Sequence, residues 1–184
     1  VAAMTAYRVE IIAVGTELLL GNVANTDAQF LSEMLASVGV DVLYHTAVGD
    51  NPARLREVVD IARGRANLLV FTGGLGPTYD DMTKQIVCEA FGLGLEFHPE
   101  IVEEIRHYFD TVFRREMPAC NLQQAYLPHG CTVLHNPVGT AASRPCCCRA
   151  CRTSAATSPS TSCCRGCAQR AMRRSSRTTC TSSA

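Results

Sequence analysis

Short apolar runs and helical apolar stripes alternate along the first 113 residues of the chain. Apolar runs at 9–14, 40–48 and 68–71 predict three buried strands. Apolar residues that recur every three or four positions predict four helices, which we place between Asn25 and Gly39, from Asn51 onward, after a loop at 72–78, and from Pro99 to Phe113. Strands that alternate with helices of this length are typical of an α/β fold with a mostly parallel sheet.

Two of these helices begin with clear capping signals. Asn25 or Thr26 can cap the first helix, and Asn51 can cap the second, with Pro52 in the first turn, where its missing N–H costs nothing. The apolar stripe of the first helix consists of Phe30, Leu31, Met34, Leu35 and Val38. Each helix therefore has one face that can cover the sheet.

The ends of the predicted strands indicate where a ligand would bind. In open parallel sheets, ligands lie outside the carboxyl ends of the strands. Three segments end up there if the strand prediction holds: Gly15, the tripeptide at 48–50 and the loop that begins at Thr72. We therefore expect the functional site where these segments converge.

The segment from Thr72 to Thr83 carries the strongest chemical signal. Gly73, Gly74 and Gly76 follow a strand and precede a helix, so backbone amides can approach a phosphate without obstruction by a Cβ atom. The segment is neither a dinucleotide fingerprint nor a P-loop, because Tyr79 replaces the third glycine and Lys84 follows Thr83. A tight structural turn is the alternative for the bare glycine pattern.

Acidic and hydroxyl side chains surround this loop in the predicted topology. Asp80 and Asp81 stand where the next helix begins, so they can cap it, or they can hold a Mg²⁺-type ion together with Asp50 and Glu17. The segments 15–17 and 21–26 can contact a ribose or base, or serve as turn and cap residues; their candidates are Gly15, Thr16, Glu17 and Asn25. Thr72 and Lys84 of the loop segment are further candidates for substrate binding.

Composition divides the chain at about residue 141. Residues 1–141 hold 17 acidic and 9 basic residues, a net charge of −8, whereas 142–184 hold 8 Arg, no acid and 8 of the 11 Cys. With Met172 as its only large apolar residue, the second segment cannot build a core, and we expect it to be a disordered tail. The chain contains no run of about 18 apolar residues, so we expect a cytoplasmic protein with no membrane contact.

Several ordered motifs in residues 9–141 closely resemble the N-terminal domain of CinA-type competence/damage-inducible proteins, which is related to MoaB and MogA. The motifs are the segments 12–21, 48–50, 72–83, 121–125, 127–130 and 136–141, together with Asn25 and Thr26. The resemblance implies a MoaB/MogA-like three-layer α/β domain at 1–141, incomplete at its C-terminal end because the family continues into a further strand and a Pro-Gly-rich loop.

The resemblance also implies an activity. CinA-type members hydrolyse the pyrophosphate of ADP-ribose or similar dinucleotides with a divalent metal such as Mg²⁺, and a monovalent cation can assist. Carried onto this chain, Asp50 and Asp81 match the acidic catalytic positions, and the ligand loop is matched by Gly73, Gly74, Gly76, Thr78 and Thr83. Our hypothesis is that Asp50, Asp80 and Asp81 hold the metal. The alternative is a degenerate domain that binds a nucleotide or pterin without turnover. The resemblance further implies a homo-oligomer, and we expect no nucleic-acid partner for the domain.

The tail at 142–184 admits two interpretations. Cys codons read one or two bases later give Ala, Val or Leu, so we interpret the tail as translated out of frame, which the coding DNA would test. The competing interpretation is a basic zinc module that contacts nucleic acid, because Cys148 with Cys151 and Cys164 with Cys167 form two pairs of thiolates.

Overall fold

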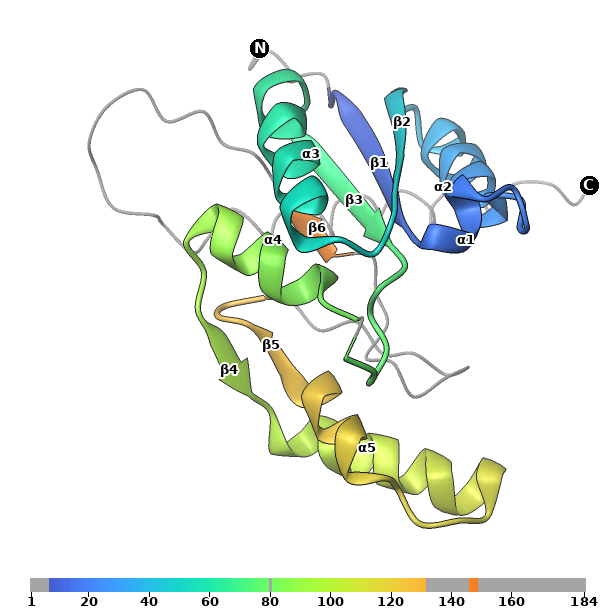
Figure 1. The fold of residues 1–184 in the computed structure, drawn as a ribbon, viewed down its shortest axis with the longest axis vertical. Helices are drawn as coiled ribbons and strands as arrows, with labels where there is room; N and C mark the ends of the chain where they lie inside the picture. Colours follow the sequence, from blue (N-terminus) through green and yellow to red (C-terminus); the bar gives the residue numbers. More distant parts are fainter. Residues whose placement is uncertain (1–6, 80, 132–145, 149–184) are drawn as a thin grey trace, which may run out of the picture.

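A four-stranded sheet in the order β2-β1-β3-β6 forms the centre of the molecule (Figure 1). In this computed structural model, the structure describes residues 7–79, 81–131 and 146–148. β1 (Val9–Val14) pairs in parallel with β2 (Val42–Val48) and with β3 (Leu68–Thr72). The predicted α/β fold with a mostly parallel sheet is confirmed.

Helices cover both faces of the sheet, which gives three layers. α3 (Pro52–Arg65) and α4 (Thr83–Phe91) cover one face, and α1 (Thr16–Leu19) and α2 (Thr26–Ser37) lie on the other (Figure 1). Alternate residues of β1 and β3 therefore enter different cores, because successive side chains of a strand point to opposite faces. Ile12 and Phe71 pack with α3 and α4, whereas Ile11 and Val70 pack with α2.

The apolar stripe of α2 lies differently from the sequence prediction. Leu31 and Leu35 pack against the sheet together with the buried Ala28, whereas Phe30 and Met34 are exposed by 61% and 47%. Residues three and four apart share a helix face, so only one of the two adjacent apolar rows can face the sheet. The second row remains on the surface.

A smaller unit follows α4 and contains elements that the periodicity did not predict. β4 (Leu95–Phe97) and β5 (Tyr126–Pro128) pair antiparallel. α5 (Pro99–Tyr108) packs against them with η2 (Ala119–Ala125), and the predicted helical pattern up to Phe113 ends in the π-helical turn η1 (Phe109–Phe113). Ile101, Ile105, Phe109 and Leu127 form the core of this unit.

The segment Cys146–Cys148 differs from the disorder predicted for residues after 141. Its backbone forms β6, which pairs antiparallel with β3. The free edge of β3 offers unpaired N–H and C=O groups, and an added strand satisfies them. The remainder of the tail, including Cys151, Cys164 and Cys167 of the predicted zinc pairs, lies outside the described residues. Within the described residues, no helix is long and apolar enough to cross a membrane.

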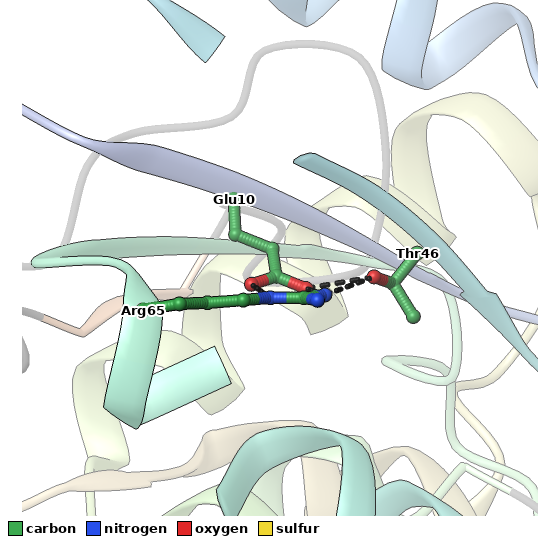
Figure 2. A network of polar contacts seen from close by, with 3 residues as sticks. All are labelled: Glu10, Thr46 and Arg65. Atoms are coloured by element: carbon green, nitrogen blue, oxygen red, sulfur yellow. Dashed lines mark hydrogen bonds and ion pairs between the residues drawn. The ribbon is translucent and has the colours of Figure 1, made fainter. Parts of the chain in front are cut away.

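A buried ion pair links the sheet to α3 (Figure 2). Glu10 of β1 is 0% exposed, and Arg65 at the end of α3 donates two hydrogen bonds to its carboxylate, of 2.9 Å from Nε and 2.6 Å from Nη2. Thr46 Oγ1 donates a third at 2.7 Å. The hydrogen bond with Glu10 raises the pKa of Arg65 above its usual value. Every oxygen of this buried carboxylate thus has a donor, as a charge in a core requires.

Candidate functional site

The carboxyl ends of β1 and β2 are joined by a pair of loops that hydrogen-bond to each other. Asp50 Oδ2 accepts hydrogen bonds from Thr16 N at 2.9 Å and from Thr16 Oγ1 at 2.8 Å. Thr16 Oγ1 in turn accepts one from Asp50 N at 3.1 Å. Because one carboxylate oxygen of Asp50 is held in this way, its orientation at the strand end is set by the neighbouring loop.

The glycines after β3 permit a close approach between the β3 loop and β1. Gly73 has φ +83°, and a Cβ atom there would collide with the carbonyl oxygen of Val14 at the end of β1. Gly74 has φ +58°, and a Cβ atom there would collide with the hydroxyl of Thr83. Only glycine accepts both the backbone conformation and the space. The predicted convergence of the three strand ends is therefore confirmed.

Thr83 hydrogen-bonds to this loop through both its side chain and its backbone. Its side chain is fully buried, and its Oγ1 donates a hydrogen bond of 3.1 Å to the carbonyl oxygen of Gly73. Its backbone N–H donates to the carbonyl oxygen of Gly74 at 3.2 Å. Thr83 is also the first residue of α4, so the loop is tied directly to the start of that helix. Within the described residues, Thr83 acts as a support for the loop.

Asp81 does not cap α4, which corrects one of the two interpretations offered for it. The helix begins at Thr83, and its N-cap residue Met82 makes no side-chain capping bond. Asp81 Oδ2 instead accepts hydrogen bonds from the backbone N–H of Thr78, at 2.8 Å, and from the Thr78 hydroxyl. A Cβ atom at Gly76 would lie 2.5 Å from the same oxygen, so the carboxylate lies beneath the glycine loop.

Asn25, Thr72 and Glu17, which were also predicted as site residues, make contacts around this site. Asn25 caps α2 by accepting a hydrogen bond from Ala28 N at 3.1 Å. Thr72 Oγ1 donates to Asp27 Oδ2 at 2.8 Å, which ties the end of β3 to the first turn of α2. Glu17 is exposed, and its carboxylate occupies the space that a Cβ atom at Gly15 would need. Asp27 was missed by the sequence analysis, since a first-turn carboxylate is ordinarily a helix-dipole partner.

A pocket of about 130 Å³ adjoins the glycine loop on the side of the smaller unit. Its walls include Gly76, Asp81, Lys84, Leu95, Gln123 and Tyr126. Lys84 Nζ donates a hydrogen bond of 2.8 Å to the backbone carbonyl of Gln123. Leu95, Gln123 and Tyr126 lie in elements that no periodicity predicted, so local sequence could not place them beside Lys84.

The described residues include only two of the three predicted metal ligands, Asp50 and Asp81. Among the described residues, no group of three or more His, Cys, Asp or Glu side chains lies close enough together to hold a metal ion. Asp50 and Asp81 each accept hydrogen bonds from a threonine, and Asp80, the third predicted ligand, lies outside the described residues. The metal site therefore stays a prediction, and no chemical step is assigned to a metal.

Comparison with known proteins gives consistent similarities. Residues 10–159 match the family described as probable molybdopterin binding domain. The chain is 52% identical, over 132 residues, to a competence-damage inducible protein of Caldicellulosiruptor saccharolyticus and to a CinA-like protein of Crocosphaera subtropica. These matches cover 72% of this chain but only 32% of each relative, so the chain spans about one third of their length.

A solved structure supports the same relationship. The structure of CinA from Thermoplasma acidophilum is similar to this chain, with 30% sequence identity and a TM-score of 0.66. The match covers 75% of this chain and 80% of that one.

Proposed function

The chain belongs to the molybdopterin-binding-domain family, with CinA proteins among its relatives, and on this premise we propose that it is a nucleotide-pyrophosphate hydrolase. The proposed substrate is ADP-ribose or a similar dinucleotide. One observation carries the proposal: the Gly73–Gly74 loop packs against the end of β1, and the residue that follows that strand end, Thr16, orients the carboxylate of Asp50. Backbone amides that can bind a phosphate and a carboxylate that can accept a proton from water therefore lie at the same edge of the sheet.

The proposed reaction breaks the phosphoanhydride bond. Water attacks one phosphorus, the new P–O bond forms as the bridging P–O bond breaks, and the products are AMP and ribose 5-phosphate. Asp50 takes one proton from the attacking water through Oδ1, since Oδ2 is held by Thr16. Loop amides at Gly73 and Gly74 stabilise the charge on the attacked phosphate. Asp81 acts as a positioning residue, because it holds Thr78 and the loop above it.

The experiment measures AMP release from ADP-ribose by the full chain with Mg²⁺ and with a chelator. We expect Asp50→Asn and Asp81→Asn each to lower kcat/KM by at least about tenfold, since a general base typically contributes about 10²–10⁴-fold and a misplaced group can cost about 10²-fold. Asp110→Asn is the matched control, because Asp110 is an exposed carboxylate on η1, away from the strand ends.

Each outcome bears on a separate part of the proposal. A loss of less than tenfold in Asp81→Asn would count against the assigned role of that carboxylate. AMP release that persists in the presence of the chelator would contradict the metal requirement that the family resemblance implies. Absence of AMP release from the wild-type chain would contradict the hydrolase itself.

A binding domain without turnover is the second candidate. It is favoured by the engagement of both described carboxylates, because Asp50 accepts hydrogen bonds from Thr16 and Asp81 accepts them from Thr78. The same loop would still bind the phosphate of a nucleotide or pterin. Calorimetric binding of ADP-ribose without AMP release would support this candidate over the hydrolase.

A further inference from the structure

The pocket beside the glycine loop has two chemically different walls. Gly76, Asp81 and Lys84 form a polar wall that belongs to the loop and to the first turn of α4. Leu95 of β4 and Tyr126 of β5 form the opposite, apolar wall. A cavity with this division suits a ligand group that has apolar faces and polar edges.

The apolar wall is the outer face of the small β4–β5 sheet. Leu127 enters the core with α5, so its neighbour Tyr126 points to the opposite face. Phe97 is directly across from Tyr126 in the strand register, and their rings lie 5.1 Å apart. Tyr126 and Phe97 are each 44% exposed, and Leu95 is 40% exposed. The three side chains thus form an aromatic and aliphatic surface open to solvent.

The size of the pocket limits what it can hold. Pockets for whole drug-sized ligands measure roughly 300–1,000 Å³, whereas this pocket measures about 130 Å³. It therefore accommodates one portion of a dinucleotide, such as a single planar ring system. Because Gly76 and Asp81 line the pocket and belong to the same segment as Gly73 and Gly74, the pocket adjoins the glycine loop.

We propose that this pocket binds the nucleobase of the substrate, which stacks on Tyr126 while the phosphates lie at the Gly73–Gly74 loop. The inference rests on the proposed function and adds a determinant of substrate class: a substrate must carry a planar heteroaromatic ring. Stacking on an aromatic side chain tolerates any base, because every base presents a π-face. Lys84 donates at the polar side of the pocket, where ring nitrogen and oxygen atoms would lie.

The test compares ligands with and without a base by calorimetry. AMP, ADP-ribose and base-free ribose 5-phosphate are titrated into the wild-type full chain and into Tyr126→Ala and Tyr126→Phe. We expect Tyr126→Ala to weaken AMP and ADP-ribose binding by about tenfold or more, the effect of losing one base–aromatic stack. We expect Tyr126→Phe to bind like the wild type, and ribose 5-phosphate binding to be the same in all three proteins.

Tyr108→Ala is the matched control, since it also removes a tyrosine that contacts a phenylalanine ring, Phe113, at 5.5 Å, but in α5. Unchanged AMP affinity in Tyr126→Ala, with AMP release from ADP-ribose intact, would overturn the inference and leave the hydrolase standing. Equal loss of ribose 5-phosphate binding would also overturn it, because Tyr126 would then support the fold. Failure of the wild-type chain to bind AMP and ADP-ribose would overturn both proposals.

Discussion

Gly73 stands where the loop after β3 touches the end of β1, and its missing side chain permits that contact. Its φ of +83° lies in the left-handed region, and its Cα faces the carbonyl oxygen of Val14. The same residue accepts a hydrogen bond from the buried hydroxyl of Thr83 through its own carbonyl. At the scale of single residues, the shape of the site thus depends on an absent Cβ and a buried hydroxyl.

Gly73→Ala is expected to lower the free energy of unfolding by about 2–4 kcal/mol, from left-handed backbone strain and the collision with Val14. Urea denaturation followed by circular dichroism measures the change. Gly64→Ala is the control, because a Cβ at Gly64 in α3 meets nothing within 4 Å. That variant should gain about 0.5–1 kcal/mol. Equal stability of Gly73→Ala and the wild type would contradict the close approach.

The Glu10–Arg65 pair predicts a second effect at residue scale. Glu10→Gln places an amide donor against the guanidinium donors of Arg65. The free energy of unfolding should therefore fall by about 2–4 kcal/mol. This loss is smaller than that expected for a fully buried pair, because the Arg65 side chain is 36% exposed. Glu103→Gln, which breaks the exposed pair with Arg106, should change it by less than about 1 kcal/mol. Thermal unfolding measures the stability of both variants. Equally small losses in Glu10→Gln and Glu103→Gln would contradict the larger contribution assigned to the Glu10–Arg65 pair.

Helix starts show how far local signals reach at the scale of elements. Asn51 accepts a hydrogen bond from Arg54 N at 3.0 Å, and Asn25 caps α2, so both capping predictions are confirmed. α4 is different, because Asp81 is engaged by Thr78 and the helix begins two residues later. A carboxylate near a helix start can accept hydrogen bonds from the helix or from the preceding turn. In this chain the turn of the glycine loop places Thr78 beside Asp81, so the carboxylate bonds to the turn.

The start of α5 gives a prediction about pH. His98 Nδ1 lies 2.7 Å from Glu100 Oε1, and this hydrogen bond, with a smaller contribution from the backbone, lowers the pKa of Glu100. A lowered pKa in the folded state means that the contribution to stability is present above the unfolded pKa and is lost as pH falls through the folded pKa. Carboxyl chemical shifts followed by NMR should therefore give a Glu100 pKa below its ordinary value.

Two variants isolate the cause of that pKa. His98→Ala should raise the pKa of Glu100 toward its ordinary value, since the largest cause of the shift is removed. His129→Ala should leave it unchanged, because His129 contacts Glu96 instead. An unaltered Glu100 pKa in His98→Ala would disprove the assignment.

At the scale of the whole molecule, the structure joins a layered sheet to a small α/β unit (Figure 1). The pocket is lined by residues of both parts. Several large apolar side chains of the layered part are exposed to solvent. Large side chains on α1, α2 and their connection are exposed by 47–69%: Leu19, Leu20, Val23, Phe30 and Met34. Exposed apolar surface of this kind is typical of interaction sites.

This surface leads to a prediction about assembly, in line with the homo-oligomer expected from the family resemblance. Light scattering after size-exclusion chromatography should give the wild-type chain a molar mass above its 19.9 kDa. Phe30→Glu should lower it, because a charge replaces an apolar residue that is 61% exposed. Val112→Glu, at an exposed position on η1, should not. A monomeric wild-type chain would contradict the expectation.

The sequence by itself determined the features that depend on neighbours along the chain. The alternation of strands and helices, the caps Asn25 and Asn51, and the glycine loop after β3 are local patterns, and their periodicity and steric demands are readable without a fold. The family resemblance added the expected activity. The sequence also predicted that the strand ends converge, since topology alone brings those ends together.

Only the tertiary structure decided which side chains meet. Thr16 and Asp50 are 34 residues apart, and Lys84 and Gln123 are 39 apart, so no local pattern encodes either contact. β4 and β5 are three-residue strands, too short for a periodic signal, and they become a wall of the pocket only because α5 packs behind them. Chemistry between distant residues depends on how layers pack, and packing is a property of the whole chain.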